Sequence, residues 1–187
     1  NVLLVRAGAM YHDIGKMDSP LFFIENQMAG INPHDELSAD ESAKVIISHV
    51  IKGIEKAKKF SLPEQIIDFI RTHHGNSMVQ YFYRQYVTKF PEKMDQTEEF
   101  SYPGPKPFSK ETAVLMMADS VEAATRSLPE KSTEKISTLV NHIIQNQMNN
   151  GQFDNAYITL KEIGLIKKIF IKKLQNIHHS RIEYPNS

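Results

Sequence analysis

The chain has 187 residues, the length of one domain, and its 22 Lys and Arg residues balance 22 Asp and Glu residues. This balance gives no field of one sign, so it does not favour a DNA or RNA polymer or an anionic membrane as partner. The absence of Cys excludes disulfides and thiolate zinc sites and is compatible with a reducing compartment. No apolar stretch approaches the roughly 20 residues that cross a bilayer, so we expect the chain itself to be soluble.

The beginning of the chain suggests a larger parent protein. The sequence starts at Asn1 without Met or a signal-like segment, and residues 2–10 are already mostly apolar. We therefore interpret the chain as an N-terminally truncated piece of a longer protein. We expect one domain over residues 1–187, in which residues 131–187 are C-terminal helices.

Helical periodicity begins with the first residues. Residues 1–12 form the first predicted helix, which we expect Gly15 to end, and residues 20–33 are expected to be irregular. A capping box of Ser38 and Glu41 begins the second predicted helix, and the lysines in its last turns suit the negative end of the helix dipole.

A third helix is predicted from the start signal at residues 61–64 to Gly75, and a short aromatic helix follows. The next segment, residues 90–108, is a long loop rich in proline. Loops of this length inside a compact domain are usually functional or disordered, and the closely spaced prolines favour an ordered, rigid rim.

Three more helices complete the chain. Ser109 caps the first of them, residues 133–148 carry a clear apolar stripe, and a capping box of Thr159 and Glu162 opens the last. The sequence shows no repeat, no low-complexity tract and no convincing strand alternation. The predicted fold class is therefore all-α.

A small set of imidazoles and carboxylates falls on apolar faces of these helices. His12 and Asp13 follow an apolar segment, where an unpaired polar group costs about 1–3 kcal/mol and an unpaired charge more. His49, His73 and Asp119 lie on the inward faces of their own helices. Taken singly, each has a structural explanation as a hydrogen-bonded core histidine or an ion-pair partner. Together they predict a metal centre with hydrolytic chemistry, because a divalent metal suits both kinds of group.

The remaining histidines and the lysine-rich runs have simpler explanations. We interpret them as turn, surface or solvated groups: His34 in a turn, His142 on an outer helix face, His178 and His179 as a surface pair, and the lysines of 56–59 and 167–173 as solvated faces. None of them enters the predicted site.

The residues of the predicted metal centre resemble those of the HD-domain metal-dependent phosphohydrolases. That family's pattern is a first His, then His-Asp, then one or more His, then Asp, and it is met here by His12-Asp13, His49, His73-His74 and Asp119. Further strings are Ala-Met-Tyr-His-Asp-Ile-Gly-Lys (9–16), Phe-Phe-Ile-Glu-Asn-Gln (22–27), Asn-Pro-His-Asp (32–35), His-His-Gly (73–75), Tyr-Phe-Tyr (81–83), Tyr-Pro-Gly-Pro-Lys-Pro (102–107) and Asp-Ser-Val-Glu-Ala-Ala-Thr-Arg-Ser-Leu (119–128). Together they resemble the cytosolic domain of the seven-transmembrane HD proteins, which are bacterial cyclic di-AMP phosphodiesterases.

The resemblance implies a helical HD-domain bundle that hydrolyses cyclic di-AMP to linear pApA. It implies a full-length protein embedded in the bacterial membrane, with this domain on the cytoplasmic side, and we also consider a homodimer. The implied cofactors are two divalent transition-metal ions, iron or manganese, which share Asp13. The implied metal ligands are His12, Asp13, His49, His73, His74 and Asp119.

Two departures from the family pattern stand out. The first metal-ligating His of the family precedes the His-Asp pair, but no His precedes His12 here, so we expect that ligand upstream of Asn1. The cyclic di-GMP branch carries Gly-Tyr-Pro after its double His. This chain has Gly75-Asn76-Ser77 there, which argues against that branch.

Residues near the predicted centre are candidates for contacts with the substrate. We expect Asp13 and Lys16 to be catalytic, and Lys16, one turn after His12, to contact the scissile phosphate; its alternative is a solvent-facing lysine. Asn26, Gln27, Tyr102 and Lys106 lie in rim segments and are candidates for binding the nucleotide. Tyr102 ranks first, because an aromatic ring stacked on a base contributes roughly 1–3 kcal/mol.

Two other functions fit the same residues. One is a different HD-type phosphohydrolase that acts on a guanosine polyphosphate or a nucleotide monoester with one metal. The other is a sensor domain that binds the nucleotide without turnover. The double histidine favours two metals and therefore the phosphodiesterase.

Overall fold

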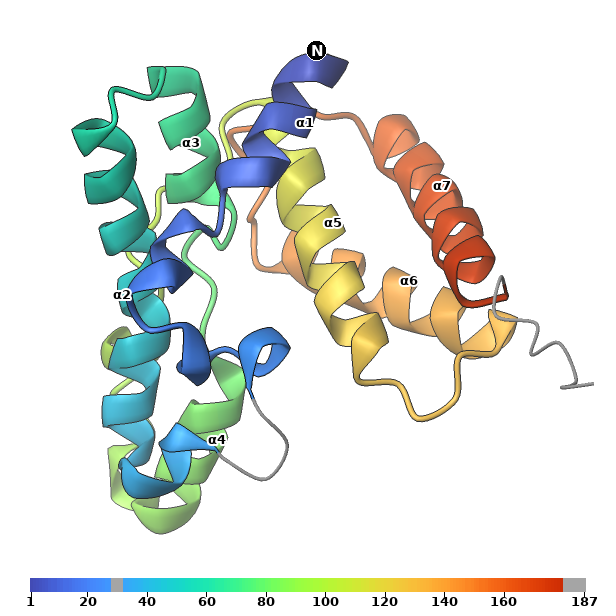
Figure 1. Cartoon of the computed structure of the whole chain (residues 1–187). Coiled ribbons are helices and arrows are strands. Elements are labelled where there is room, and N and C mark those ends of the chain that lie inside the picture. Colours follow the sequence, from blue (N-terminus) through green and yellow to red (C-terminus); the bar gives the residue numbers. More distant parts are fainter. Residues whose placement is uncertain (28–31, 180–187) are drawn as a thin grey trace, which may run out of the picture. The chain divides into compact units, whose positions relative to one another are not determined.

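The computed structural model describes residues 1–27 and 32–179, and the side chains up to residue 177 (Figure 1). The chain divides into two units, Asn1–Lys106 and Pro107–Ser187. Part of the segment expected to be irregular, residues 28–31, and the side chains of His178 and His179 lie outside the described residues, so those expectations stay predictions.

In its described residues, 1–27 and 32–106, the first unit has four α-helices and several short 3₁₀ segments. Its α-helices are α1 (Val2–Tyr11), α2 (Ala39–Lys59), α3 (Glu64–Thr72) and α4 (Gln80–Lys89). Its 3₁₀ segments are η1 (Ile14–Asp18), η2 (Pro20–Phe22), η3 (Ile24–Asn26), η4 (Pro33–Glu36), η5 (Pro91–Lys93) and η6 (Glu98–Phe100).

The second unit contains α5 (Lys110–Arg126), α6 (Thr133–Asn149) and α7 (Leu160–His179), which pack on one another. Within residues 1–27 and 32–179 the structure has no β-strand, only an isolated bridge between Met78 and Ser101. The predicted all-α class is therefore confirmed. Among the described residues, no helix combines the length and the apolar character that crossing a bilayer requires.

The capping boxes form as the local sequence predicts. The Ser38 amide donates to Glu41 Oε2 at 2.9 Å, and the Glu41 amide donates back to Ser38 Oγ at 3.4 Å. The Thr159 and Glu162 pair repeats this arrangement at the start of α7, at 2.8 and 3.2 Å. These bonds satisfy backbone donors that have no partner inside the helix.

Two glycines let the first unit close around its amino-terminal segment. A Cβ atom on Gly8 would lie 2.4 Å from the Phe69 ring, so α1 packs directly on α3. A Cβ atom on Gly15 would lie 1.9 Å from the His49 carbonyl oxygen and 2.5 Å from the Gly53 nitrogen. The backbone of η1 therefore lies against the backbone of α2, as the glycine at position 53 allows.

The end of the first helix differs from the prediction. The helix predicted over residues 1–12 is observed as Val2–Tyr11, but Gly15 does not end it: Gly15 lies in η1, where it has no positive φ. The physical reason is packing: Gly15 is needed for the close approach to α2, and it does not serve as a helix cap. At Gly75 the prediction is confirmed, since its φ of +53° follows the last turn of α3.

The proline-rich segment after α4 is fixed to the residues that follow the double histidine. The Val79 amide donates to the Phe100 carbonyl at 2.8 Å, and the Tyr102 amide donates to the Ser77 carbonyl at 2.9 Å. Phe100 itself is fully buried. These contacts hold Tyr102 beside the end of α3.

The second unit has its own apolar core. Helices α5, α6 and α7 contribute buried side chains at the predicted helical spacing, among them Met116, Met117, Ile136, Val140, Ile144, Ile163 and Leu174. The stripe predicted for residues 133–148 is therefore confirmed as the buried face of α6.

Candidate metal centre

His12 and Asp13 lie at the end of α1, where the chain turns into η1. The His12 Nε2 atom is 3.2 Å from Asp13 Oδ2, and the two side chains are 15% and 30% exposed. The packing of Gly15 against α2 carries this pair to the side of α2 that bears His49. The carboxylate is therefore half-buried beside the imidazoles of other helices.

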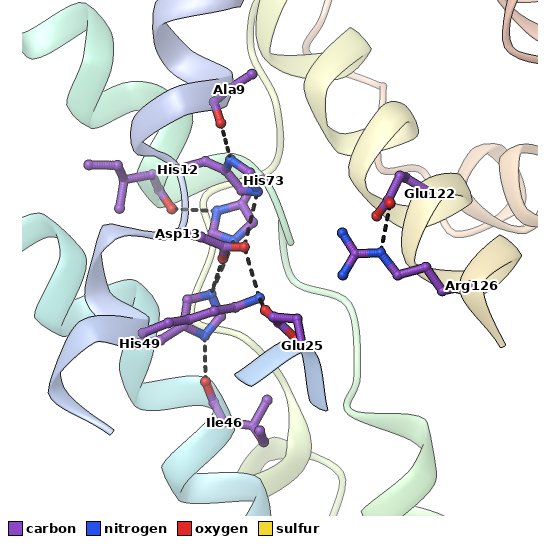
Figure 2. Close-up of polar contacts among 11 residues, drawn as sticks. Ala9, His12, Asp13, Glu25, Ile46, His49, His73, Glu122 and Arg126 are labelled. Atoms are coloured by element: carbon purple, nitrogen blue, oxygen red, sulfur yellow. Dashed lines mark hydrogen bonds and ion pairs between the residues drawn. The ribbon is translucent and has the colours of Figure 1, made fainter. Parts of the chain in front are cut away.

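His49 on α2 and His73 at the end of α3 are buried and face each other (Figure 2). Their Nε2 atoms are 3.1 Å apart, and Asp13 Oδ1 is 3.4 Å from the first and 3.6 Å from the second. Three helical segments therefore deliver ring nitrogens and a carboxylate oxygen to one point.

The backbone fixes how these rings are protonated. The Nδ1 atoms of His12, His49 and His73 lie 2.9, 2.6 and 2.8 Å from the carbonyl oxygens three residues earlier, those of Ala9, Ile46 and Ile70. A carbonyl oxygen only accepts, so each Nδ1 must carry the proton and donate it. In the neutral ring each Nε2 then presents a lone pair, which is the arrangement of metal-binding histidines.

The resulting cluster brings several hydrogen-bond acceptors close together. The lone pairs of His49 and His73 Nε2 meet the carboxylate oxygen of Asp13, and acceptors at this distance repel one another without a proton or cation between them. Burial lowers the pKa of His49 to about 4, and the neighbouring His73 adds to the shift, so His49 resists protonation. Burial opposes ionisation of Asp13, but its close contacts with the His12 and His73 rings outweigh burial and hold the pKa of Asp13 well below its usual range. The donor set therefore fits a divalent cation.

His74 extends the group of nitrogen donors. One ligand atom from each of His49, His73 and His74 lies within 4.8 Å of the others. The Tyr102 ring stacks on the His74 ring, with centroids 4.2 Å apart and planes 23° apart. Burial, reinforced by His73, lowers the pKa of His74 well below its ordinary value, so this ring too is neutral.

Lys16 is the cation beside Asp13. Its Nζ atom is 2.8 Å from Asp13 Oδ2 and donates to Glu25 Oε1 at 2.6 Å, and it lies 5.0 Å from the centre of the Phe23 ring. Burial opposes its charge, but Asp13 and Glu25 outweigh burial and raise the pKa of Lys16. Glu25 was not among the predicted site residues, although its place directly before Asn26 was a signal that could have found it.

The predicted rim residues have different surroundings. Asn26 is exposed at the end of η3, and Gln27 Nε2 donates to Asn32 Oδ1 at 3.3 Å. Tyr102 is only 8% exposed, and Lys106 is half-buried at the end of the first unit. Their contacts with a substrate stay predictions.

Asp119 belongs to the second unit and is half-buried on α5. On the same helix Arg126 Nε donates to Glu122 Oε1 at 2.7 Å (Figure 2). The membership of Asp119 in the metal centre stays a prediction. His34 lies in a turn as expected, since its amide donates to Asn32 Oδ1 at 3.2 Å at the start of η4; its Nε2 atom also lies 2.9 Å from the Phe22 carbonyl oxygen.

Comparison with known proteins decides the family of this site. The profile of the HD domain matches residues 1–124, which is most of the chain and includes every histidine and carboxylate of the candidate metal centre. The chain belongs to the HD-domain family. The fold and the family inferred from the sequence are thereby confirmed.

Among HD-domain relatives, the chain is 47% identical over 189 residues to the cyclic-di-AMP phosphodiesterase PgpH of Bacillus subtilis and 42% identical over 186 residues to that of Listeria monocytogenes. Each alignment covers 100% of this chain and 26% of the relative. The chain therefore spans about a quarter of the length of these relatives.

Solved HD domains show the same architecture. The L. monocytogenes PgpH HD domain in complex with cyclic-di-AMP superposes with a TM-score of 0.91 at 42% identity, covering 95% of this chain and 82% of that one. A second structure of this domain superposes with a TM-score of 0.88.

Proposed function

We propose that this chain is the catalytic domain of a metal-dependent phosphodiesterase that hydrolyses cyclic di-AMP to linear pApA. The observation that carries the proposal is the convergence of Asp13 with the Nε2 atoms of His49 and His73 in an HD domain. The choice of substrate is supported by the 42% identity to an HD domain solved in complex with cyclic-di-AMP.

The cofactors are proposed to be two divalent ions, iron or manganese. Nitrogen and oxygen donors without a thiolate suit these metals. The proposed ligands are His12, Asp13, His49, His73, His74 and Asp119, together with a His expected upstream of Asn1. When bound, such ions lower the pKa of a water molecule and offset the negative charge of a phosphate.

Two charged residues, Asp13 and Lys16, are proposed to prepare the site for metal and substrate. Asp13 contacts both buried imidazoles and supplies the fixed negative charge that attracts cations. Lys16 brings a positive charge next to Asp13, and we propose that it turns from Glu25 to a non-bridging phosphate oxygen when the substrate binds. Hydrolysis then adds one water across a phosphodiester bond, leaving a phosphate monoester at one end of the product and a hydroxyl at the other.

The rim is proposed to hold the nucleosides. Asn26 and Gln27 offer amide groups, and Lys106 offers a cation for the second phosphate. Tyr102 is also a proposed substrate residue, but its low exposure and its stacking on His74 favour a role in holding that ring in place. In that role Tyr102 affects the substrate only indirectly, through the position of the His74 ring.

The setting of the whole protein is proposed from the same resemblance. We propose that the full-length protein is embedded in the cell membrane, that this domain works on the cytoplasmic side, and that a homodimer forms. The relatives are about four times as long as this chain, which supports a larger parent protein, whereas the membrane location and the homodimer rest on the family resemblance.

The direct test measures hydrolysis by the chain and by a longer form that includes residues upstream of Asn1. Each is loaded with Mn²⁺ and incubated separately with cyclic di-AMP, cyclic di-GMP, a guanosine polyphosphate and a nucleoside triphosphate. We expect linear pApA from cyclic di-AMP, faster with the longer form because it supplies the expected ligand.

Each other outcome points to a different function. Cleavage of the guanosine polyphosphate or the triphosphate alone would assign the chain to another branch of HD phosphohydrolases. Binding of cyclic di-AMP by calorimetry with no product from the longer form would indicate a sensor domain.

A further inference from the structure

Helix α7 concentrates positive charge in a chain whose overall charge is balanced. Its residues 160–173 carry five lysines, at positions 161, 167, 168, 172 and 173, against a single acid, Glu162. That carboxylate accepts a hydrogen bond from Lys110 at 2.6 Å. In the part of the chain that the structure describes, none of the five lysines has an ion-pair partner.

The same helix presents apolar side chains to the outside. Ile163 and Leu174 are 4% and 6% exposed and pack into the core of the second unit. On the opposite side Leu165 and Ile169, one turn apart, are 58% and 46% exposed. Residues at this spacing share a helix face, so they form one apolar strip.

Three of the lysines border this strip. Lys161 precedes Leu165 by four residues, Lys168 follows it by three, and Lys172 follows Ile169 by three, and all three are exposed. A shallow hollow in this face is lined in part by Lys161, Leu165 and Lys168. At about 3.6 residues per turn these three lysines fall on the same side of Leu165 and Ile169. The exposed face of α7 is therefore apolar along one edge and cationic along the other.

Further apolar side chains are exposed near the ends of the helix. Tyr157, just before α7, is 89% exposed, Leu160 at its start is 75% exposed, and Ile177 near its end is 63% exposed. They do not continue the strip at helical spacing, so the continuous surface consists of Leu165, Ile169 and the lysines beside them.

We propose that this face, made of Lys161, Leu165, Lys168, Ile169 and Lys172, docks on an anionic phospholipid bilayer. Leucine and isoleucine enter the boundary between headgroups and acyl chains, and the adjoining lysines meet the lipid phosphates. A second copy of the chain fits this face less well, because pairing α7 with α7 would bring lysines against lysines. The inference goes beyond the proposed hydrolysis and uses none of the residues of the metal centre.

The test is sedimentation of the chain with vesicles. Vesicles of phosphatidylcholine alone are compared with vesicles that also contain phosphatidylglycerol, at low and at high salt. We expect binding only to the anionic vesicles, and loss of binding at high salt because the lysine contribution is screened. Hydrolytic activity plays no part in this measurement, so its outcome is independent of the proposed function.

Two variants identify the face. Lys161→Gln/Lys168→Gln/Lys172→Gln should reduce the partition coefficient on the order of a hundredfold, since each lysine near an anionic surface contributes about fivefold. Leu165→Ser/Ile169→Ser should reduce it without changing its dependence on salt. The matched control, Lys52→Gln/Lys58→Gln/Lys59→Gln on α2, removes the same charge elsewhere and should bind as the parent chain does.

Several results would overturn the proposal. Equal binding to neutral vesicles, or an equal loss in the α2 control, would show that the α7 face is not the anionic-lipid site. An increase in mass with concentration that Leu165→Ser/Ile169→Ser abolishes would identify the face as a contact between copies. Circular dichroism of each variant establishes that the fold is retained.

Discussion

The imidazole rings of the first unit owe their orientation to the backbone of their own segments. His12, His49 and His73 each donate Nδ1–H to a carbonyl three residues earlier, so each directs its Nε2 lone pair away from its own backbone. Asp13 Oδ1 then lies 3.4 Å and 3.6 Å from two of these nitrogens. At the scale of single residues, the site is a set of acceptors that a cation would satisfy.

Removing the charge of Asp13 should abolish turnover while leaving the fold intact. Asp13→Asn keeps the shape of the side chain, but it loses the negative charge and places an amide donor in the cluster. We expect hydrolysis to fall by several orders of magnitude and bound metal to fall with it. Product formation and elemental analysis are the measurements.

The neighbouring Asp18 provides the control for this change. Asp18 accepts a hydrogen bond from Lys56 at 2.6 Å and lies outside the cluster. Asp18→Asn should retain turnover and metal. If Asp13→Asn keeps normal turnover, the reaction takes place elsewhere.

The stability of the metal-free protein should fall as the pH falls from about 6.5 to about 4. The pKa of His49 is lowered from its ordinary 6.5 to about 4, so in this window the unfolded chain binds a proton that the folded chain does not. The full effect is on the order of 3 kcal/mol. Urea unfolding in the presence of a chelator, at a series of pH values, measures it.

A variant separates His49 from the other histidines in that experiment. His49→Gln removes one titrating group and should reduce the dependence on pH to the part that the buried His74 contributes, whereas His142→Gln, at an exposed position, should leave it unchanged. A profile that is the same in all three proteins would assign the loss of stability to other groups.

At the scale of elements, the position of the cluster depends on the backbone contact between η1 and α2. Gly15 allows this contact because a Cβ atom would overlap the His49 carbonyl. The contact sets the distance from Asp13 to His49 and His73. The geometry of this site is therefore fixed by direct packing of two backbones, whereas in most cores side-chain packing fixes the geometry.

Gly15→Ala should separate η1 from α2. The added methyl group meets backbone atoms that cannot move aside, so we expect a loss of about 1–3 kcal/mol in the free energy of unfolding and weaker metal binding. Denaturant unfolding and metal titration measure the two effects.

The matched control is Gly164→Ala on α7. A Cβ atom at Gly164 has no atom within 4 Å among those described. Because alanine is the better helix former, we expect this change to be neutral or to stabilise by about 0.5–1 kcal/mol. If both changes behave alike, close packing at Gly15 is not what holds η1 in place.

The sequence predicted those elements that are coded locally. Ser38 with Glu41, and Thr159 with Glu162, mark helix starts within four residues, and the structure has them there. The inward positions of His49 and His73 followed from helical spacing. What could not be predicted were contacts between segments, because their partners are distant in sequence: Gly15 against His49, Tyr102 on His74, and Lys16 with Glu25.

At the scale of the whole molecule, the chain is built from two units, and the histidine cluster belongs to the first. A metal ion bound by that cluster would stabilise the folded state, by about 2.7 kcal/mol at a free concentration a hundred times the dissociation constant. The second unit has its own core on α5, α6 and α7. We therefore expect metal to stabilise the first unit more than the second.

Hydrogen exchange with and without chelator should show this difference. We expect chelation to reduce protection most in α2, α3 and the segment around His12, and least in α6 and α7. Protection of α5 around Asp119 tests the remaining predicted ligand: a change there on chelation supports it. A uniform change along the chain would mean that the two units unfold together.

The hydrogen bonds from ring to carbonyl have a mechanical consequence. Each imidazole is tethered to its own backbone segment, so it can turn only when that segment turns. A small rotation of α2 against α3 would change the distance between the Nε2 atoms of His49 and His73 and so weaken their binding of an ion. A neighbouring domain or a bound partner that rotates these helices would therefore change the affinity of the site for metal.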